Sequence, residues 1–185
     1  MDFRLSALLI KAIGVFILLA IIGGFVFGII RLIRLLLKII KLKQPLIITY
    51  YVLMIMCILI VAASWILNMG WYRVILTWLA VPFVHPVIFA VINGKTLPNL
   101  IYSAKLKAYT LITYITYVLM YAFFPDGGDV GSSYVFFGLI SNDTVVYTLG
   151  LLSTVCLVTY IIFTILQVIE NGKVKKKLYN TIKAR

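Results

Sequence analysis

The stretch that decides the fold is Thr144–Ile169, TVVYTLGLLSTVCLVTYIIFTILQVI, which contains no charged residue. A helix needs about 20 predominantly apolar residues to cross the hydrocarbon core of a bilayer, so this stretch can span it. Four more uncharged apolar runs come close to or reach that length: Ala12–Ile30, Leu46–Leu67, Val74–Ile92 and Ala108–Phe124. The sequence therefore predicts an all-α, polytopic membrane helical bundle with five transmembrane helices, in one integral membrane domain over residues 1–185.

The Lys and Arg residues are concentrated in the segments between and after these runs. Fourteen of the seventeen fall in Arg31–Lys43, Asn93–Lys107 and Glu170–Arg185. Membrane proteins keep Lys and Arg in their short cytoplasmic loops. The pattern predicts a multi-pass protein of the bacterial inner (cytoplasmic) membrane, with a basic cytosolic tail at residues 170–185 and the N-terminus outside. If Ala12–Ile30 lies along the bilayer instead of crossing it, four spans with both termini in the cytosol result.

The net charge of +12 would suggest a nucleic-acid partner in a soluble protein. Here the requirement for positive cytosolic loops and the attraction to anionic lipid headgroups account for it. We therefore expect membrane lipids, anionic on the cytosolic side, as partners, and no direct contact with nucleic acid.

The residues after the first apolar run form an amphipathic pattern. Arg31, Arg34, Lys38 and Lys41 are spaced 3, 4 and 3 residues apart, which places them on one face of a helix. We expect a cytosolic extension of the first helix that ends before Pro45, since proline disfavours helix for the preceding residue. The predicted contacts for lipid or a cytosolic protein partner are these four residues with Lys175, Lys176 and Lys177.

Two features of the apolar runs predict packing or polar contacts within the membrane. Gly24 and Gly28 form a GxxxG pattern, which lets two helices approach closely and favours a homo-oligomer.

His85 lies between Pro82 and Pro86, and prolines leave helix carbonyls without their usual donors. An ionisable residue at this depth is a candidate for function. The alternative is a neutral imidazole that binds one of the freed carbonyls.

A third candidate lies in the segment between the last two runs. Asp126 and Asp129 flank Gly127 and Gly128, and glycines let the backbone fold back on itself. The two carboxylates could therefore converge in an outer loop that serves recognition or loop architecture, the alternative being a solvated turn. The following Val135–Ile140 is too short to span and is predicted to form an interfacial helix.

The polar residues of the last two runs predict buried faces, without indicating an enzyme. Tyr114, Tyr117 and Tyr121 share one helix face, which should point into the bundle or toward another subunit. Cys57 and Cys156 lie inside apolar runs and are expected to be packing residues rather than a disulfide. No HExxH, Cys/His cluster or nucleotide-binding loop occurs in the sequence. We expect a non-enzymatic protein without cofactor or metal.

These features favour a membrane-embedded scaffold or sensor subunit that oligomerises and recruits or regulates a cytosolic protein. The alternative function is a small channel or transporter subunit with a polar path near His85. The general build resembles bacteriocin-immunity proteins and membrane components of phage-defence systems such as Kiwa, although no motif matches residue by residue. This resemblance implies a setting in bacterial immunity or antiviral defence.

Overall fold

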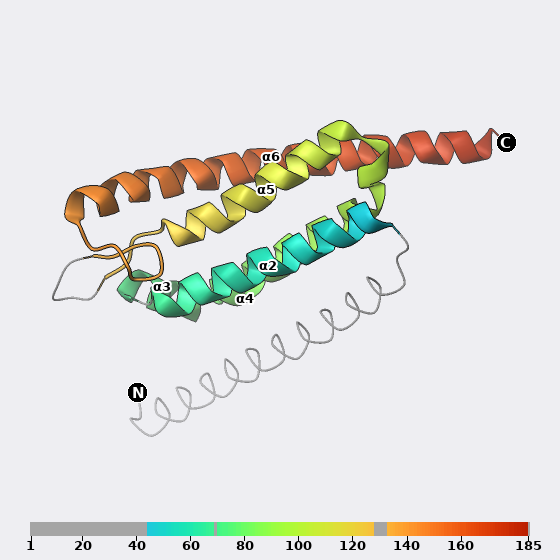
Figure 1. Cartoon of the computed structure of the whole chain (residues 1–185). Helices are drawn as coiled ribbons and strands as arrows, with labels where there is room; N and C mark the ends of the chain where they lie inside the picture. The colour runs from blue at the N-terminus through green and yellow to red at the C-terminus, as the bar shows by residue number, and fades with distance from the viewer. Residues whose placement is uncertain (1–43, 69, 128–132, 185) are drawn as a thin grey trace, which may run out of the picture. The chain divides into compact units, whose positions relative to one another are not determined.

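A computed structural model describes residues 44–68, 70–127 and 133–184, and within them the structure is helical apart from short connections (Figure 1). The helices are, in chain order, α2 (Pro45–Leu67), α3 (Trp71–Trp78), α4 (Val81–Thr96), the 3-10 helix η1 (Leu97–Tyr102), α5 (Ala104–Ala122) and α6 (Asp143–Lys183). The predicted all-α class is confirmed for these residues. The predictions that lie outside them concern the run Ala12–Ile30, Gly24, Gly28, Arg31, Arg34, Lys38, Lys41 and Asp129.

The described helices pack side by side into a bundle. Helix α5 packs along α6, α2 packs against α5, and α4 contacts both α2 and α6 (Figure 1). We call one end of this bundle the loop end, formed by the described residues 68, 70–80, 123–127 and 133–142. The opposite end, formed by η1, the start of α5 and residues 167–183 of α6, is called the lysine end.

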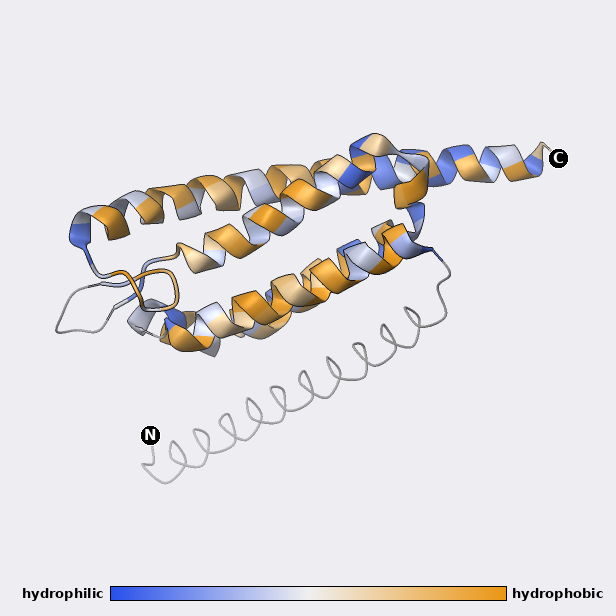
Figure 2. Cartoon of the chain, viewed as in Figure 1, coloured by the Kyte–Doolittle hydropathy of each residue, from blue (hydrophilic) through white to orange (hydrophobic). Residues whose placement is uncertain are grey.

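Two of the helices, α2 and α6, are long and apolar enough to cross a membrane, and a third crossing results if α3 and α4 form one bent span. Figure 2 shows apolar residues over most of α2 and the first part of α6, and hydrophilic residues toward the end of α6. Helix α5 forms where the run Ala108–Phe124 predicts it, but its first turn carries Lys105 and Lys107. The sequence thus places the apolar helices correctly, and the count of five spans stays a prediction.

The predicted span Val74–Ile92 is wrong as one continuous helix. The chain breaks between α3 and α4, and α3 is bent by 68° from the α4–η1 unit. At the break Ala80 adopts the left-handed conformation with φ of 59°. Pro82 lies in the first turn of α4. Backbone N–H groups in the first turn have no acceptor within the helix, so the absence of an N–H at proline removes no helical hydrogen bond there. Proline thus starts the second helix, whereas Pro86 is accommodated inside it.

The predicted interfacial helix at Val135–Ile140 is also wrong. Val135 and Ile140 instead form an antiparallel bridge, with the Val135 N–H donating to the Ile140 carbonyl at 2.9 Å. The turn between them has positive φ at Phe136, Phe137 and Gly138. Left-handed residues cannot continue a right-handed helix. The apolar composition of this segment therefore did not determine its conformation, and its position at the membrane interface stays a prediction.

The break before α4 makes a testable prediction about Ala80. Ala80→Gly should raise the free energy of unfolding by about 0.5–1 kcal/mol, because glycine adopts positive φ without the steric conflict of a Cβ. The matched control is Ala90→Gly within α4, which should lower it by about 1 kcal/mol. Reversible unfolding in mixed micelles, followed by circular dichroism, measures both. Destabilisation of equal size by the two changes would contradict a left-handed Ala80.

Candidate functional site

The carboxylate of Asp126 at the loop end accepts four hydrogen bonds. Its side chain is fully buried, and it accepts hydrogen bonds from the backbone N–H groups of Gly70 at 3.1 Å, Tyr72 at 3.1 Å and Arg73 at 2.9 Å. The Gly127 N–H donates to it as well, at 2.9 Å. The first N–H groups of a helix have no partner within the helix. Asp126 therefore caps the N-terminus of α3 from a distant part of the chain.

The side chain of Arg73 has the complementary role at the ends of two other helices. Its guanidinium donates to the Ser64 carbonyl in α2, and to the carbonyls of Tyr121 at 2.8 Å and Phe124 at 3.2 Å in and after α5. Each of these carbonyls accepts a second hydrogen bond as well: Ser64 from the Asn68 N–H at 3.1 Å, Tyr121 from the Ser64 hydroxyl at 3.0 Å and Phe124 from Asn68 Nδ2 at 3.1 Å. Nε of Arg73 also lies 3.9 Å from an oxygen of Asp126, with both side chains fully buried. Arg73 thus joins the ends of two helices while pairing with the residue that caps α3.

We call Arg73 and Asp126 the clasp, because together they close the ends of three helices. Gly70 lies directly against it, and a Cβ at this position would overlap the Asp126 carboxylate. Asn68 extends the same network, since its Nδ2 donates to the Phe124 carbonyl at 3.1 Å. Its Oδ1 accepts from the Gly138 N–H at 3.0 Å, which ties the Val135–Ile140 turn to the end of α2.

The clasp changes the interpretation of the predicted outer-loop site. A solvated turn is wrong for Asp126, which is 1% exposed and already accepts four N–H groups. Of the two roles predicted from the sequence, loop architecture matches this geometry, and recognition stays a prediction. Arg73 was not among the candidates. The signal that could have found it is an isolated arginine at the edge of an apolar run, a position that in lipid requires a partner.

The intramembrane candidate, His85, lies in a cluster of aromatic side chains. Its Nδ1 is 2.5 Å from the hydroxyl of Tyr121, and its ring packs against Tyr117, Tyr121 and Tyr160. The alternative of a bond to a freed helix carbonyl is therefore wrong, since the partner is a tyrosine hydroxyl. The predicted burial of the face with Tyr114, Tyr117 and Tyr121 is confirmed. The structure brings His85 and this face together, although no spacing pattern in the sequence pairs them.

The lysine end carries polar contacts that the sequence did not reveal. Gln167 donates to the Asn93 side chain at 2.8 Å and to Thr110 at 3.0 Å, so it joins α6 to α4 and α5. One turn further, Asn99 donates to Asn171 at 2.7 Å. Ser103, which caps α5, also donates to Glu170 at 2.9 Å. These bonds fix the direction in which α6 leaves the bundle.

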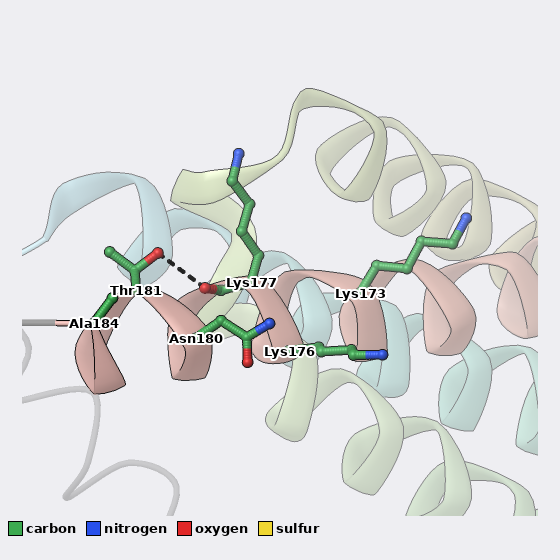
Figure 3. A pocket seen from close by; sticks show the side chains of 6 residues that line it. All are labelled: Lys173, Lys176, Lys177, Asn180, Thr181 and Ala184. Carbon is green, nitrogen blue, oxygen red and sulfur yellow. Dashed lines mark hydrogen bonds between the residues drawn. The ribbon is translucent and has the colours of Figure 1, made fainter.

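Beyond these contacts α6 continues to Lys183 and carries the predicted residues Lys175, Lys176 and Lys177, all exposed. Figure 3 shows an open pocket lined by Lys173, Lys176, Lys177, Asn180, Thr181 and Ala184. Five of them belong to α6 and Ala184 is its C-cap, so this is one face of a helix rather than a cavity between elements. Lys173 lies 4.0 Å from Glu170 but remains 72% exposed. The predicted basic tail is therefore helical as far as Lys183.

Within the described residues no group of three or more His, Cys, Asp or Glu residues could hold a metal ion. Cys57 and Cys156 are buried free thiols, as predicted. No protein-family model, no curated protein and no solved structure matches this chain.

The clasp predicts a large effect of one isosteric change. Asp126→Asn replaces an acceptor-only carboxylate by an amide and leaves the Arg73 guanidinium buried without its counter-charge. Breaking a buried pair from one side costs about 3–5 kcal/mol, so the folded protein should be strongly destabilised in micelles. The control is Asp143→Asn, because Asp143 is exposed in the first turn of α6. Equal unfolding midpoints for the two variants would contradict the clasp.

Proposed function

We propose that this protein is a non-enzymatic membrane scaffold or sensor subunit that presents the basic end of α6 to an acidic cytosolic protein. We place it in the bacterial inner membrane as a homo-oligomer, with the lysine end in the cytosol, in an immunity or antiviral-defence setting. The observation that carries the proposal is that α6 continues as one helix to Lys183, beyond its hydrogen bonds to the bundle at Glu170 and Asn171.

The length of α6 supports a protein partner over a purely lipid one. Its 41 residues extend about 60 Å at 1.5 Å per residue, about twice the hydrocarbon thickness of a bilayer. The part after Asn171 alone extends about 18 Å. Charges interact with a surface over a Debye length of about 8 Å at physiological ionic strength. Lysines near the bundle can therefore reach headgroups, whereas the last turns are better placed to bind a soluble protein.

The surface of this extension has the composition of a protein-binding helix. Lysines occupy most of its circumference, while Tyr179 and Ile182 remain 66% and 75% exposed. Val174, Leu178 and Ile182 are spaced four residues apart on one face, and since Val174 is buried at 8% exposure, the free apolar part of this face consists of Leu178 and Ile182. An acidic amphipathic helix could cover such a face and pair with the lysines around it.

The geometry favours this function over the alternative of a channel or transporter subunit. A polar path near His85 would need side chains that face an accessible space. In the described bundle the ring of His85 is packed against three tyrosines, and Gln167, Asn93 and Thr110 are at most 1% exposed and bond to one another. His85 itself is half-buried, and the polar side chains of Gln167, Asn93 and Thr110 bond to one another instead of facing an open path. Ion or solute flux through reconstituted protein that is lost in His85→Phe would support the alternative.

The proposal predicts a salt-dependent interaction that depends on the end of α6. Replacing Lys176, Lys177 and Lys183 together by Gln should abolish co-purification of one acidic soluble protein with the full chain in mild detergent. The control replaces Lys95, Lys105 and Lys107 by Gln, which removes the same charge at the same end of the bundle. Quantitative mass spectrometry of the purified complexes, at low and high salt, is the measurement. Equal recovery of the partner with both variants would contradict the proposal.

A further inference from the structure

Helix α3 is amphipathic in the opposite sense to a helix on the surface of a soluble protein. Its polar residues Arg73 and Thr77 face the bundle, where Arg73 is fully buried and Thr77 accepts from Trp65 Nε1 at 3.0 Å. Its outward face consists of Trp71, Tyr72, Ile75, Trp78 and Leu79, which are 52%, 65%, 53%, 85% and 68% exposed. A surface helix in water shows the reverse pattern.

The outward face of α3 carries no charge, because its single ionisable group besides Tyr72 is Arg73 and this residue is turned inward. The neighbouring turn continues the surface, with Phe136 39% and Leu139 77% exposed. It is held at this end by the bond from Gly138 to Asn68. The Trp71 N–H, which donates to the Gly127 carbonyl at 3.1 Å, fixes the start of α3 in the same region. An apolar surface of this kind marks a site that contacts a membrane, a ligand or another protein instead of water.

The bend between α3 and α4 bears on the depth at which α3 lies. Helix α4 extends about 24 Å, and it meets the length and composition of a membrane span only together with α3. The bend of 68° turns α3 largely across the direction of α4, so its 8 residues add only about 4–5 Å along that direction. An orientation of this kind at the loop end suits a helix that lies along the membrane boundary.

We infer that α3 is an interfacial membrane anchor, with its Trp71, Tyr72, Ile75, Trp78 and Leu79 face inserted at the boundary between lipid headgroups and acyl chains. Tryptophan and tyrosine concentrate at this depth, because their rings are apolar and their N–H and O–H groups can still reach water or headgroups. The clasp determines which face of α3 meets the lipid, since Arg73 holds the polar face against the bundle. This inference does not depend on the proposed recruitment of a cytosolic partner.

Tryptophan fluorescence in lipid vesicles tests the anchor, since the chain contains three tryptophans and the third, Trp65, is 5% exposed. The full chain is reconstituted in phosphatidylcholine whose acyl chains carry bromine either near the headgroup or near the bilayer centre. The fluorescence emission of Trp78 is obtained by subtracting the emission of the Trp78→Phe variant from that of the unaltered protein. Phenylalanine is apolar and Trp78 is exposed, so this variant retains the fold. The control is Tyr147→Phe on an exposed position of α6.

The Trp78 emission should be lost most strongly with bromine near the headgroup and only weakly with bromine at the bilayer centre, and Tyr147→Phe should leave the quenching profile unchanged. Strongest quenching from the bilayer centre would overturn the inference, because α3 would then lie within a span. Quenching by aqueous iodide but not by either lipid would overturn it in favour of exposure to water. Resistance to all three quenchers would overturn it in favour of a protein cover, such as a second copy of the chain.

Discussion

The described bundle depends on a single arrangement in which one carboxylate and one guanidinium, both fully buried, satisfy backbone groups from three helices. A helix that ends in lipid or under other helices leaves N–H and C=O groups that water cannot reach, and each costs several kcal/mol if it stays unpaired. Asp126 accepts the first N–H groups of α3, and Arg73 donates to the last carbonyls of α2 and α5. The charge of each residue is offset by the other, 3.9 Å away.

The two ends of the bundle use polar residues in opposite ways. At the loop end the clasp and Asn68 bond to backbone groups inside the protein, while Nε of Arg73 is buried without a hydrogen-bond partner, and aromatic and aliphatic residues of α3 face outward. At the lysine end Gln167, Glu170 and Asn171 fix α6 to its neighbours, and the lysines beyond them stay exposed. One end is therefore suited to lipid and the other to an aqueous partner. The proposed membrane scaffold follows from this asymmetry.

Much of the helix layout could be predicted from the sequence, because long uncharged runs have few alternatives in lipid. The run Leu46–Leu67 coincides with α2 almost to the residue, and Thr144–Ile169 lies within α6. The break at Ala80 could not be predicted in the same way, since hydropathy reports the environment of a segment and not its backbone conformation. The turn at Val135–Ile140 is a second instance, where an apolar composition suits a short helix and a hairpin equally.

The candidate site was harder to predict because its residues are distant in the sequence. Asp126 and Arg73 are 53 residues apart, and no local spacing pattern connects them. Asp126 follows a proline and precedes glycines, which is the usual composition of a solvated turn, and only the meeting of three helix ends makes it a buried cap. The same holds for Gln167 and Asn93, whose amides are found on different helices 74 residues apart.

The measurement that tests the clasp most directly is hydrogen–deuterium exchange of the protein in lipid nanodiscs, resolved to single amides around residues 70–73. The account predicts that the amides of Gly70, Tyr72 and Arg73 exchange as slowly as those in the middle of α2, although they lie at the start of a short helix after a connection. The buried Asp126 carboxylate that accepts them is the reason. Exchange as fast as that of the exposed last turn of α6 would contradict the account.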